Sequence, residues 1–365
     1  MKTILTVIGT RPEAIKLAPV LVELNKSWHF INKTCITKQH SDLLDSVLLP
    51  LGIVADYKLQ YQESNGSLHS SAANILRQLE YILAEAKPDL VIVQGDTTTA
   101  FVSTLAAFYS RISVAHVEAG LRTGKLYYPW PEEAHRCLID QLSSYFFVPT
   151  KNAQKNLLKE GVPAERIWVV GNTSIDAINL IRKNCQAAAR PKQRTILATI
   201  HRRENHGAIL QEICYAIRTI AEQFFDINIK FCLHANHIVR NVVIRQLSGL
   251  RNVNLIEPLE HRLFIEYLDA SIFVMTDSGG VQEESTFVGK PVLVIRDTTE
   301  RPEVIQAGTA QLVGTKAADI ITCCRELLEN DKKLNAMSKV HFPYGKGDTA
   351  KKIVKILEQE LTKNK

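Results

Sequence analysis

The chain has 365 residues, of which 45% are hydrophobic and 22% are charged. This composition is typical of a folded globular protein, and the length suits two domains of ordinary size. The net charge of +6 is mild and the basic residues are scattered, which argues against nucleic acid as a partner and suits an anionic small substrate. No apolar run reaches the ~18 residues that span a bilayer, so we expect no membrane partner.

The N-terminal stretch and the cysteines indicate a cytoplasmic protein. The opening MKTILTVIGTRPEA reads as a first strand and lacks a signal-peptide cleavage region. The seven cysteines form no C-x-x-C pair, and most lie in apolar surroundings, which is typical of buried free thiols in a reducing compartment. Because no spacing of Cys and His matches a zinc site, we expect no metal.

In the first half of the chain, short β-branched runs alternate with longer helical patterns, as in parallel βαβ units. The strand runs are continuously apolar, as expected when helices cover both faces of a sheet. The predicted strands are Thr3–Ile8, Lys33–Thr37, Leu90–Gln94, Ile112–His116 and Tyr145–Val148, and the predicted helices include Pro12–Asn25, Leu68–Ala86 and Thr98–Tyr109.

The pattern restarts after a polar, proline-containing segment, residues 183–193, which we interpret as a linker. We predict two Rossmann-like, doubly wound α/β domains, residues 1–172 and 173–348, with an active site in the cleft between them. The final helix, Thr349–Leu361, could belong to either domain, and residues 349–365 could pack back on the first. The strands predicted for the second domain are Thr195–Thr199, Ile229–Leu233, Asn254–Ile256, Ile272–Met275 and Pro291–Ile295.

Polar clusters follow three predicted strands of the first domain. The stretch GTRPEAIK offers a helix N-terminus flanked by Arg11 and Lys16, which is either an anion site or an ordinary capped helix. Asp96 follows a buried strand and precedes a threonine-rich helix start, where by itself an N-cap is the more common role. Glu118 follows a strand in an apolar frame, so its carboxylate is either paired or raised in pKa.

A loop with two prolines around a tryptophan, YYPWPEEAHR, leads into the next helix. Glu132 and Arg136 are four residues apart there and could pair across one turn. Glu118 and Glu132 are two acids of buried context on consecutive strand-end loops, which favours a function for both. The neighbouring residues that we interpret as solvated or structural are Glu133, His116 and His135.

Three clusters mark strand ends in the second domain. In TDSGGVQEE, backbone N–H groups of residues 278–280 can approach a phosphate, and an acid one turn later can accept from ribose hydroxyls. Arg296 and Arg301 flank a further strand-end loop, RDTTERPE. In TIHRRENHG, His201 is the first residue after a strand, where it is either structural or a group that handles protons or phosphates.

Taken together and in this order, GTRPEAIK, GDTTT, HVEAGLRTG, PWPEEAHR, HRRENHG, TDSGGVQEE and RDTTERPE closely resemble the motifs of the non-hydrolysing UDP-N-acetylglucosamine 2-epimerases, over nearly the whole chain. The resemblance implies a glycosyltransferase-B-like fold, a homodimer, and reversible conversion of UDP-GlcNAc to UDP-ManNAc for surface polysaccharide synthesis. It also implies that the reaction proceeds through UDP elimination and 2-acetamidoglucal, with no cofactor and no metal.

Carried over position by position, the resemblance assigns the site residues. Asp96, Glu118 and Glu132 match the acid/base carboxylates of the family. The residues that match groups around the diphosphate, the reacting sugar, the ribose and the uracil are Arg11, Lys16, His201, Phe264, Ser278, Gly279, Gly280, Glu284 and Arg301.

The chemistry agrees with such a set. Carbon 2 of the sugar has no neighbouring carbonyl, so its proton becomes removable only when departing UDP leaves positive charge on carbon 1. That route needs at least two proton-handling carboxylates, together with cations or helix N-termini for the leaving diphosphate. Three alternatives stay open: a hydrolysing epimerase that releases UDP and free ManNAc, a glycosyltransferase of the same fold, and a non-catalytic sugar-nucleotide sensor.

The chain departs from the family pattern at three places, one of which is LHANHIV, where His237 and Ile238 replace the usual Pro-Asn. Leu259 and His261 stand in the uracil loop where the family often has Gln and Tyr, which puts base affinity in doubt. Gly66 stands where many members carry Gln in a second, activating UDP-GlcNAc site. The other residues that match this site are Gln39, His40, Arg202 and His234.

Allosteric activation by UDP-GlcNAc is therefore a hypothesis. It predicts a sigmoidal rate curve, or a lag when UDP-ManNAc is the only substrate added. Steady-state kinetics checks it, and hyperbolic kinetics from pure UDP-ManNAc would contradict it.

Overall fold

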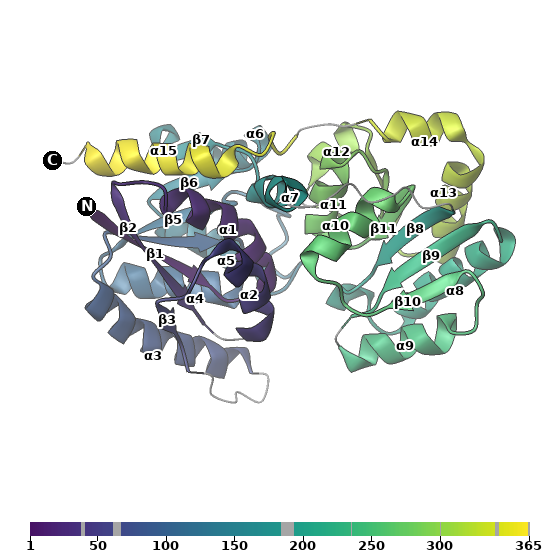
Figure 1. Ribbon diagram of the computed structural model, residues 1–365, viewed down its shortest axis with the longest axis horizontal. Helices are drawn as coiled ribbons and strands as arrows, with labels where there is room; N and C mark the ends of the chain where they lie inside the picture. The colour runs from purple at the N-terminus through teal and green to yellow at the C-terminus, as the bar shows by residue number, and fades with distance from the viewer. Residues whose placement is uncertain are drawn as a thin grey trace. The chain divides into compact units, whose positions relative to one another are not determined.

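The computed structural model describes residues 1–37, 41–60, 67–183, 193–234, 236–299, 301–339 and 343–363. The chain forms two compact units, Met1–Leu180 with Tyr344–Lys365, and Ile181–Pro343. Each unit has a parallel β-sheet with helices packed against it (Figure 1). The predicted class, two doubly wound α/β halves, is confirmed.

The first unit is built on a sheet in which the described residues form seven strands, all parallel. The strand order reverses between the first and fourth strands of the chain, and such a switch point is where doubly wound sheets bind ligands. Across the sheet, the strands are β3 (Tyr57–Lys58), β2 (Phe30–Ile36), β1 (Lys2–Ile8), β4 (Leu90–Gln94), β5 (Ser113–Val117), β6 (Tyr145–Val148) and β7 (Ile167–Val169).

Alternation of buried residues along the central strands explains why helices cover both faces of this sheet. Ile4 and Ile8 of β1 pack in one core cluster, whereas Leu5 and Val7 pack in another. The first cluster lies under α1, α2 and α15 and the second under α3 and α4, on the opposite face (Figure 1). The helices of this unit are α1 (Arg11–Leu24), α2 (Ser41–Leu48), α3 (Leu68–Ala86), α4 (Thr98–Tyr109), α5 (Glu132–Leu142), α6 (Lys151–Lys159), α7 (Thr173–Lys183) and α15 (Thr349–Thr362).

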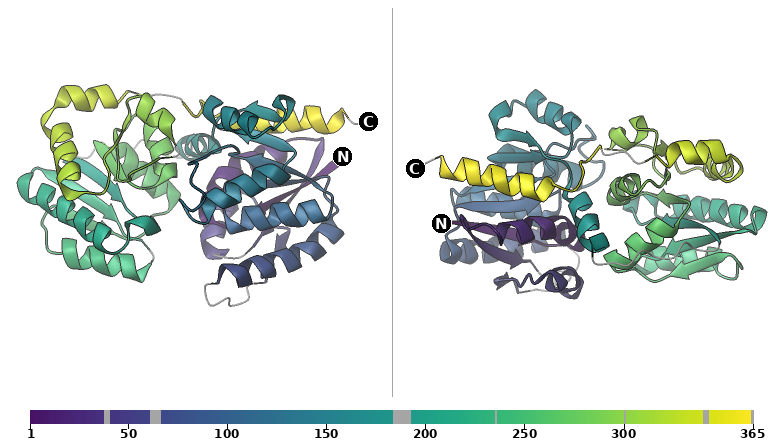
Figure 2. Two further views of the ribbon diagram at one scale, coloured as in Figure 1. Left: turned by 180° about the vertical axis from the view of Figure 1, so that it is seen from behind. Right: turned by 45° about the horizontal axis from the view of Figure 1, so that its top comes forward.

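The C-terminal helix α15 returns to the first unit and packs beside α1 (Figure 2). Ile353 and Leu357 on its apolar face are buried in the same core as β1. Asp176 of α7 holds the start of the helix, because its carboxylate accepts the N–H groups of Thr349 at 3.3 Å and Ala350 at 3.0 Å. A carboxylate at a helix N-terminus is favourable both as a hydrogen-bond acceptor and against the helix dipole.

The second unit repeats the architecture with a six-stranded parallel sheet in the described chain. No helix in that part of the chain, in either unit, is long and apolar enough to cross a membrane. Across the sheet the strands are β10 (Val253–Ile256), β9 (Ile227–Cys232), β8 (Arg194–Thr199), β11 (Phe273–Thr276), β12 (Val292–Val294) and β13 (Ala310–Leu312). The helices are α8 (Ala208–Gln223), α9 (His237–Leu247), α10 (His261–Ala270), α11 (Gly279–Phe287), α12 (Pro302–Gln306), α13 (Ala317–Glu329) and α14 (Asp331–Met337).

All the strands predicted from the sequence are present, with ends displaced by a few residues. Three strands were missed, namely β3, β7 and β13, and each is an edge strand of two or three residues. An edge strand has one free side and less buried surface, so its sequence need not carry an apolar run. The linker predicted over residues 183–193 falls largely outside the described ranges.

Glu13 ties the loop after β1 to the loop after β4. Its Oε2 accepts the backbone N–H groups of Thr10 at 2.6 Å and Gly9 at 3.1 Å, and its Oε1 accepts the hydroxyl of Thr97 at 2.7 Å. The side chain is only 1% exposed. Burial raises the pKa of Glu13 to about 7, although these hydrogen bonds pull it down.

This raised pKa predicts that Glu13 lowers stability as pH rises. Between pH ~4.5 and ~7 the unfolded chain releases the Glu13 proton while the folded chain keeps it, so the free energy of unfolding falls by about 3 kcal/mol and then levels off. Glu13→Gln removes this titration, and urea unfolding at pH 5 and pH 8 checks it. From pH 5 to pH 8, we expect the free energy of unfolding of the variant to rise by about 2–3 kcal/mol relative to that of the wild type.

Glu23→Gln is the matched control, because Glu23 lies at the other end of α1 and pairs with Lys26 near the surface. Its stability should follow the wild type at both pH values. An equal pH dependence for the wild type and Glu13→Gln would contradict the prediction.

Candidate active site

In the first unit the predicted acids follow neighbouring strands. β4 and β5 pair in parallel, so the loops that follow them leave the sheet at the same edge. Asp96 stands in the loop after β4, Glu118 comes directly after β5, and Glu132 is the first residue of α5. The fold therefore places Asp96 and Glu118 on adjacent loops, and α5 follows from the second of them.

The Asp96 carboxylate is bound by an arginine and does not cap a helix. Its Oδ2 accepts from Arg136 Nε at 2.8 Å and lies 2.6 Å from Arg136 Nη2. The Asp96 carbonyl lies 2.9 Å from Nδ1 of His135. The cap of α4 is Thr97, whose hydroxyl accepts the N–H of Ala100 at 3.0 Å, so the interpretation of Asp96 as an N-cap is wrong. The Asp96 side chain stays 26% exposed and can meet a ligand.

Arg136 also binds Glu133, the second acid of α5. Its Nη1 donates to Glu133 Oε2 at 2.7 Å, and Glu133 Oε1 accepts the N–H groups of Thr123 at 2.8 Å and Gly124 at 3.0 Å. Glu133 is 2% exposed, so its interpretation as a solvated acid is wrong. The predicted pair of Arg136 with Glu132 is wrong as well, because the buried face of α5 brings Glu133 to Arg136. Glu132 makes no hydrogen bond or ion pair with the described part of the chain.

Glu118 is paired and sits in strained backbone. Its φ of +70° is in the left-handed region, which non-glycine residues seldom adopt and which recurs at functional sites. Its carboxylate forms an ion pair with Lys16, and its Oε2 accepts from Asn172 Nδ2 at 3.0 Å. Asn172 is fixed in turn, because its Oδ1 caps α7 through the N–H of Ser174 at 3.0 Å and its own N–H donates to the Tyr344 carbonyl at 2.7 Å.

The sequence left two alternatives for the Glu118 carboxylate, a paired group or one with a raised pKa, and the structure shows the paired group. Lys16, predicted to lie near the diphosphate, lies against this acid, and both side chains are about nine-tenths buried. Sequence reasoning missed Asn172, which is 54 residues from Glu118. Its signal was weak, since an asparagine at a helix start is common for capping alone.

Arg11 is the first residue of α1 and is half-buried. The turn before it needs a glycine, because a Cβ on Gly9 would lie 2.0 Å from Oγ1 of Thr99 in α4. This close approach presses the loop after β1 against the start of α4. The Arg11 and Asp96 loops are thereby held together.

In the second unit His201 follows β8 and is organised by Asp277, which follows the neighbouring strand β11. The Asp277 carboxylate accepts the N–H groups of His201 at 3.0 Å and Arg202 at 2.8 Å, and the amide of Asn205 at 2.9 Å. Nδ1 of His201 lies 3.5 Å from Asp277 Oδ1. Sequence reasoning missed Asp277, although a carboxylate directly after an apolar strand was a usable signal.

His201 lies against His234, with ring centroids 5.8 Å apart and nearly parallel planes. Burial lowers the pKa of His201 even though Asp277 opposes the shift, and burial also lowers the pKa of His234. Both imidazoles are therefore mainly neutral at pH 7. A bound anion would favour protonation, so His201 can become cationic as negative charge develops beside it.

The start of α11 forms an anion-binding feature. Ser278 is its N-cap, and Gly279 and Gly280 form its first turn, where N–H groups are free of helical partners. A Cβ on Gly279 would lie 2.3 Å from Nη1 of Arg301, so the guanidinium packs directly on this turn. Apart from its own helix turn, no atom of the described residues lies within 4 Å of the Cβ position of Gly280. Arg301 is held there by Glu283 Oε1, which accepts its Nε at 2.6 Å.

His261, one of the residues at which the sequence departs from the family pattern, contacts an acid of the same unit. Nε2 of His261, the first residue of α10, lies 2.8 Å from Oε1 of Glu284, the predicted ribose acceptor. Phe264 is half-buried on the same helix. His261 thus orients the Glu284 carboxylate and leaves its other oxygen for a ligand.

The predicted second nucleotide-sugar site is described only in part. Gln39, His40 and Gly66 lie outside the described residues. Arg202 and His234 flank His201 in the second unit, as above. Nowhere in the described ranges do three His, Cys, Asp or Glu side chains converge so as to hold a metal ion.

Comparison with known proteins agrees with these arrangements. The family model for UDP-N-acetylglucosamine 2-epimerase matches residues 22–358. The UDP-N-acetylglucosamine 2-epimerase of Escherichia coli K12 is 46% identical, with 97% of this chain and 98% of the relative covered.

Solved structures are similarly close. The crystal structure of UDP-GlcNAc 2-epimerase from Neisseria meningitidis bound to UDP-GlcNAc is 43% identical with a TM-score of 0.96, covering 98% of this chain and 100% of the other. The Methanocaldococcus jannaschii enzyme in complex with UDP-GlcNAc and UDP is 33% identical with a TM-score of 0.86, covering 98% and 99%. The implied glycosyltransferase-B-like fold is confirmed. With a family model matched over most of its length and relatives above 40% identity over nearly all of it, this chain belongs to the UDP-N-acetylglucosamine 2-epimerase family.

Proposed function

We propose that this chain interconverts UDP-GlcNAc and UDP-ManNAc by eliminating UDP and adding it back through 2-acetamidoglucal, without hydrolysis. The observation that carries the proposal is a set of three acids with different partners. Asp96 forms an ion pair with Arg136, Glu118 forms one with Lys16, and Glu132 forms an ion pair with neither cation. Proton removal at one face of carbon 2 and return at the other needs more than one such group. The family relationship supports the same reaction.

The partners of the acids suit proton transfer. Arg136 and Lys16 stabilise the ionised forms of Asp96 and Glu118, and an ionised carboxylate is what a proton acceptor must be. Glu118 is also fixed in direction by its strained backbone and by Asn172. We assign proton transfer to the three acids as a group, because each could serve in one direction of a reversible reaction.

The second unit supplies the groups for the nucleotide. We assign the leaving diphosphate to the first turn of α11 and Arg301, where N–H groups and a guanidinium coincide, and to His201. Glu284, oriented by His261, is assigned to the ribose hydroxyls and Phe264 to the uracil face. Arg11, at the N-terminus of α1, is assigned to the reacting end of the substrate.

A cytoplasmic location is part of the proposal. The described cysteines are all free, and burial raises the pKa of the Cys214 and Cys232 thiols to about 12, so these thiols are unreactive. Free, unreactive thiols fit a reducing compartment. Surface polysaccharide synthesis is the use that the family resemblance implies.

We also propose that the enzyme is a homodimer formed through the first unit. Large apolar side chains are exposed on three successive helices there, namely Tyr81 on α3, Phe108 and Tyr109 at the end of α4, and Leu138 on α5. Since α3 packs on α4 and α4 on α5, a second copy of the chain could cover them together.

Sedimentation equilibrium tests the dimer. We expect a mass of twice the 41.0 kDa chain, and a shift toward the monomer in Phe108→Lys. Trp28→Lys, in the loop after α1 and with an aromatic side chain that is 77% exposed, should leave the mass unchanged. A wild-type protein that sediments as a monomer at micromolar concentration would show this proposal to be wrong.

The reaction itself is tested by incubating the protein with UDP-GlcNAc in heavy water, with no added cofactor, and following it by NMR. We expect deuterium at carbon 2, a minority of UDP-ManNAc and almost no free UDP. Stoichiometric UDP release would instead identify a hydrolysing epimerase, and unchanged substrate would identify a sensor. Asp96→Asn is the control variant, expected to keep UDP binding and lose at least ~100-fold in turnover.

A further inference from the structure

His116 is a fully buried imidazole held between two acceptors. Its Nδ1 lies 2.6 Å from Oδ1 of Asp140 in α5, and its Nε2 lies 2.8 Å from the carbonyl oxygen of Gly95. The side chains of His116 and Asp140 are both 0% exposed. The proposed reaction uses neither residue directly, so such a costly burial of polar groups needs another explanation.

The hydrogen bonds fix the protons of this pair. A carbonyl oxygen only accepts, so Nε2 of His116 carries a proton toward Gly95. Asp140 Oδ2 accepts the N–H of Gly120 at 3.1 Å and lies 2.8 Å from Arg122 Nη2. Burial would raise the pKa of Asp140, but His116 and Arg122 outweigh it and lower the pKa overall. The 2.6 Å contact between Nδ1 of His116 and Oδ1 of Asp140 is the second hydrogen bond that holds the ring.

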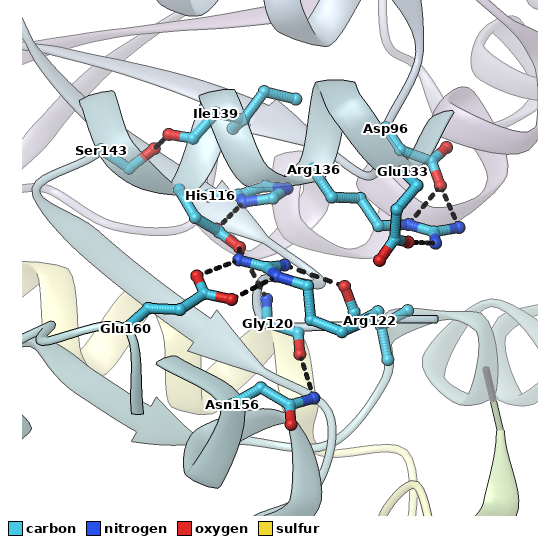
Figure 3. Close-up of polar contacts among 12 residues, drawn as sticks. Asp96, His116, Gly120, Arg122, Glu133, Arg136, Ile139, Ser143, Asn156 and Glu160 are labelled. Carbon is cyan, nitrogen blue, oxygen red and sulfur yellow. Dashed lines mark hydrogen bonds and ion pairs between the residues drawn. The ribbon is translucent and has the colours of Figure 1, made fainter. Parts of the chain in front are cut away.

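Charged groups close the outer side of the pair. Arg122 bridges Asp140 to Glu160 of α6, whose Oε1 accepts the Arg122 Nε at 2.7 Å (Figure 3). The Cys137 thiol of α5 lies nearby, and burial raises its pKa, so it is uncharged at neutral pH. The charges around His116 therefore form a closed, hydrogen-bonded network, which is the condition under which buried charges are tolerated.

This pair is attached to both loops that carry the proposed acids. Through His116 it holds the Gly95 carbonyl, which belongs to the peptide that leads into Asp96. Through Asp140 it holds the N–H of Gly120, two residues after Glu118. Both attachment points are glycines in left-handed backbone, at φ +72° for Gly95 and +79° for Gly120. Glycine is free to adopt many conformations, so the hydrogen bonds from this pair select the one that each loop takes.

We propose that the hydrogen-bonded pair His116–Asp140 is a positioning element that holds the Asp96 and Glu118 carboxylates in the geometry needed for proton transfer. The proposal rests on the assignment of those two acids to the reaction. His116 and Asp140 touch no substrate, and they act by fixing the backbone of the two loops from inside the fold. Arg136 fixes the Asp96 side chain from the same helix, so α5 controls this acid at both the backbone and the carboxylate.

Two variants separate the two hydrogen bonds of His116. An asparagine amide nitrogen takes the place of Nδ1 and keeps the donor to Asp140, whereas a glutamine amide nitrogen takes the place of Nε2 and keeps the donor to Gly95. We expect His116→Asn to lower kcat by about 30-fold with less than a threefold change in KM, because a small misplacement of an acid affects the transition state more than substrate binding. His116→Gln should stay within about fivefold of the wild type, because Gly95 keeps its donor and Asp140 still holds Gly120 together with Arg122.

Ser143→Ala is the matched control at the C-terminal end of α5, because the Ser143 hydroxyl, within the described ranges, bonds to the helix it follows, at the Ile139 carbonyl 2.8 Å away (Figure 3). It should lower stability slightly and leave kcat unchanged. Circular dichroism and thermal unfolding then show that all variants compared are folded. A folded His116→Asn with wild-type kcat, or equal kcat losses in the Asn and Gln variants, would overturn the proposal.

The hydrogen bond to Gly95 is tested separately in the whole wild-type protein, so the proposal does not depend on whether a variant folds. Nitrogen NMR of histidine-labelled protein should show one histidine whose Nε2 carries a proton that is hydrogen-bonded to a carbonyl oxygen, and this signal should disappear in His116→Asn. A His116 whose Nε2 carries no proton would overturn the proposal, because its bond to the Gly95 carbonyl could then not form.

The variant Asp96→Asn distinguishes this proposal from the proposed function. If Asp96→Asn turns over normally, the assignment of the acids fails, whatever His116 does. If Asp96→Asn is inactive while folded His116→Asn is fully active, only the positioning role fails.

Discussion

The loops of this protein depend on one repeated interaction, a buried carboxylate that accepts backbone N–H groups from a loop at a strand or helix end. Glu13 does this for the turn after β1, Asp140 for the turn after β5 and Asp277 for the turn after β8. Glu133 does it for the long loop before α5, and Asp176 for the start of α15. Each converts a flexible connection into a fixed platform, because a buried carboxylate without its donors would cost several kcal/mol.

This arrangement divides the acids of the first unit into two classes. Glu13, Glu133 and Asp140 each accept backbone N–H groups with one oxygen, bind a neighbouring side chain with the other, and are almost fully buried. Asp96 and Glu132 keep part of their surface in solvent, and Glu118 is held by side chains that belong to the site itself. More acids therefore lie near the strand ends than the proposed proton transfer needs. The structural acids are recognised by full burial together with hydrogen bonds from backbone N–H groups.

The second unit shows how recognition elements are kept in place by their neighbours. Arg301 packs on the glycine turn of α11 and is oriented by Glu283, so the cation and the helix N–H groups face the same region. Glu284 is oriented by His261, at a position where the family often has another residue. Such support leaves little rotamer freedom to lose when a ligand binds, which improves affinity without further contacts.

The sequence by itself determined the central strands, most helix positions and the family, because continuous apolar runs and strand-end motifs are local signals. It could not show β3, β7 and β13, because an edge strand of two or three residues carries too short an apolar run to be recognised. It also misjudged Glu133 and the partner of Arg136, since the buried face of α5 is chosen by the loop that packs on it. Only the tertiary structure decided that Asp140 meets His116, that Asn172 meets Glu118 and that Asp277 holds His201, because these contacts join residues 24 to 76 positions apart. Parallel strand order, which no local pattern encodes, brings them together.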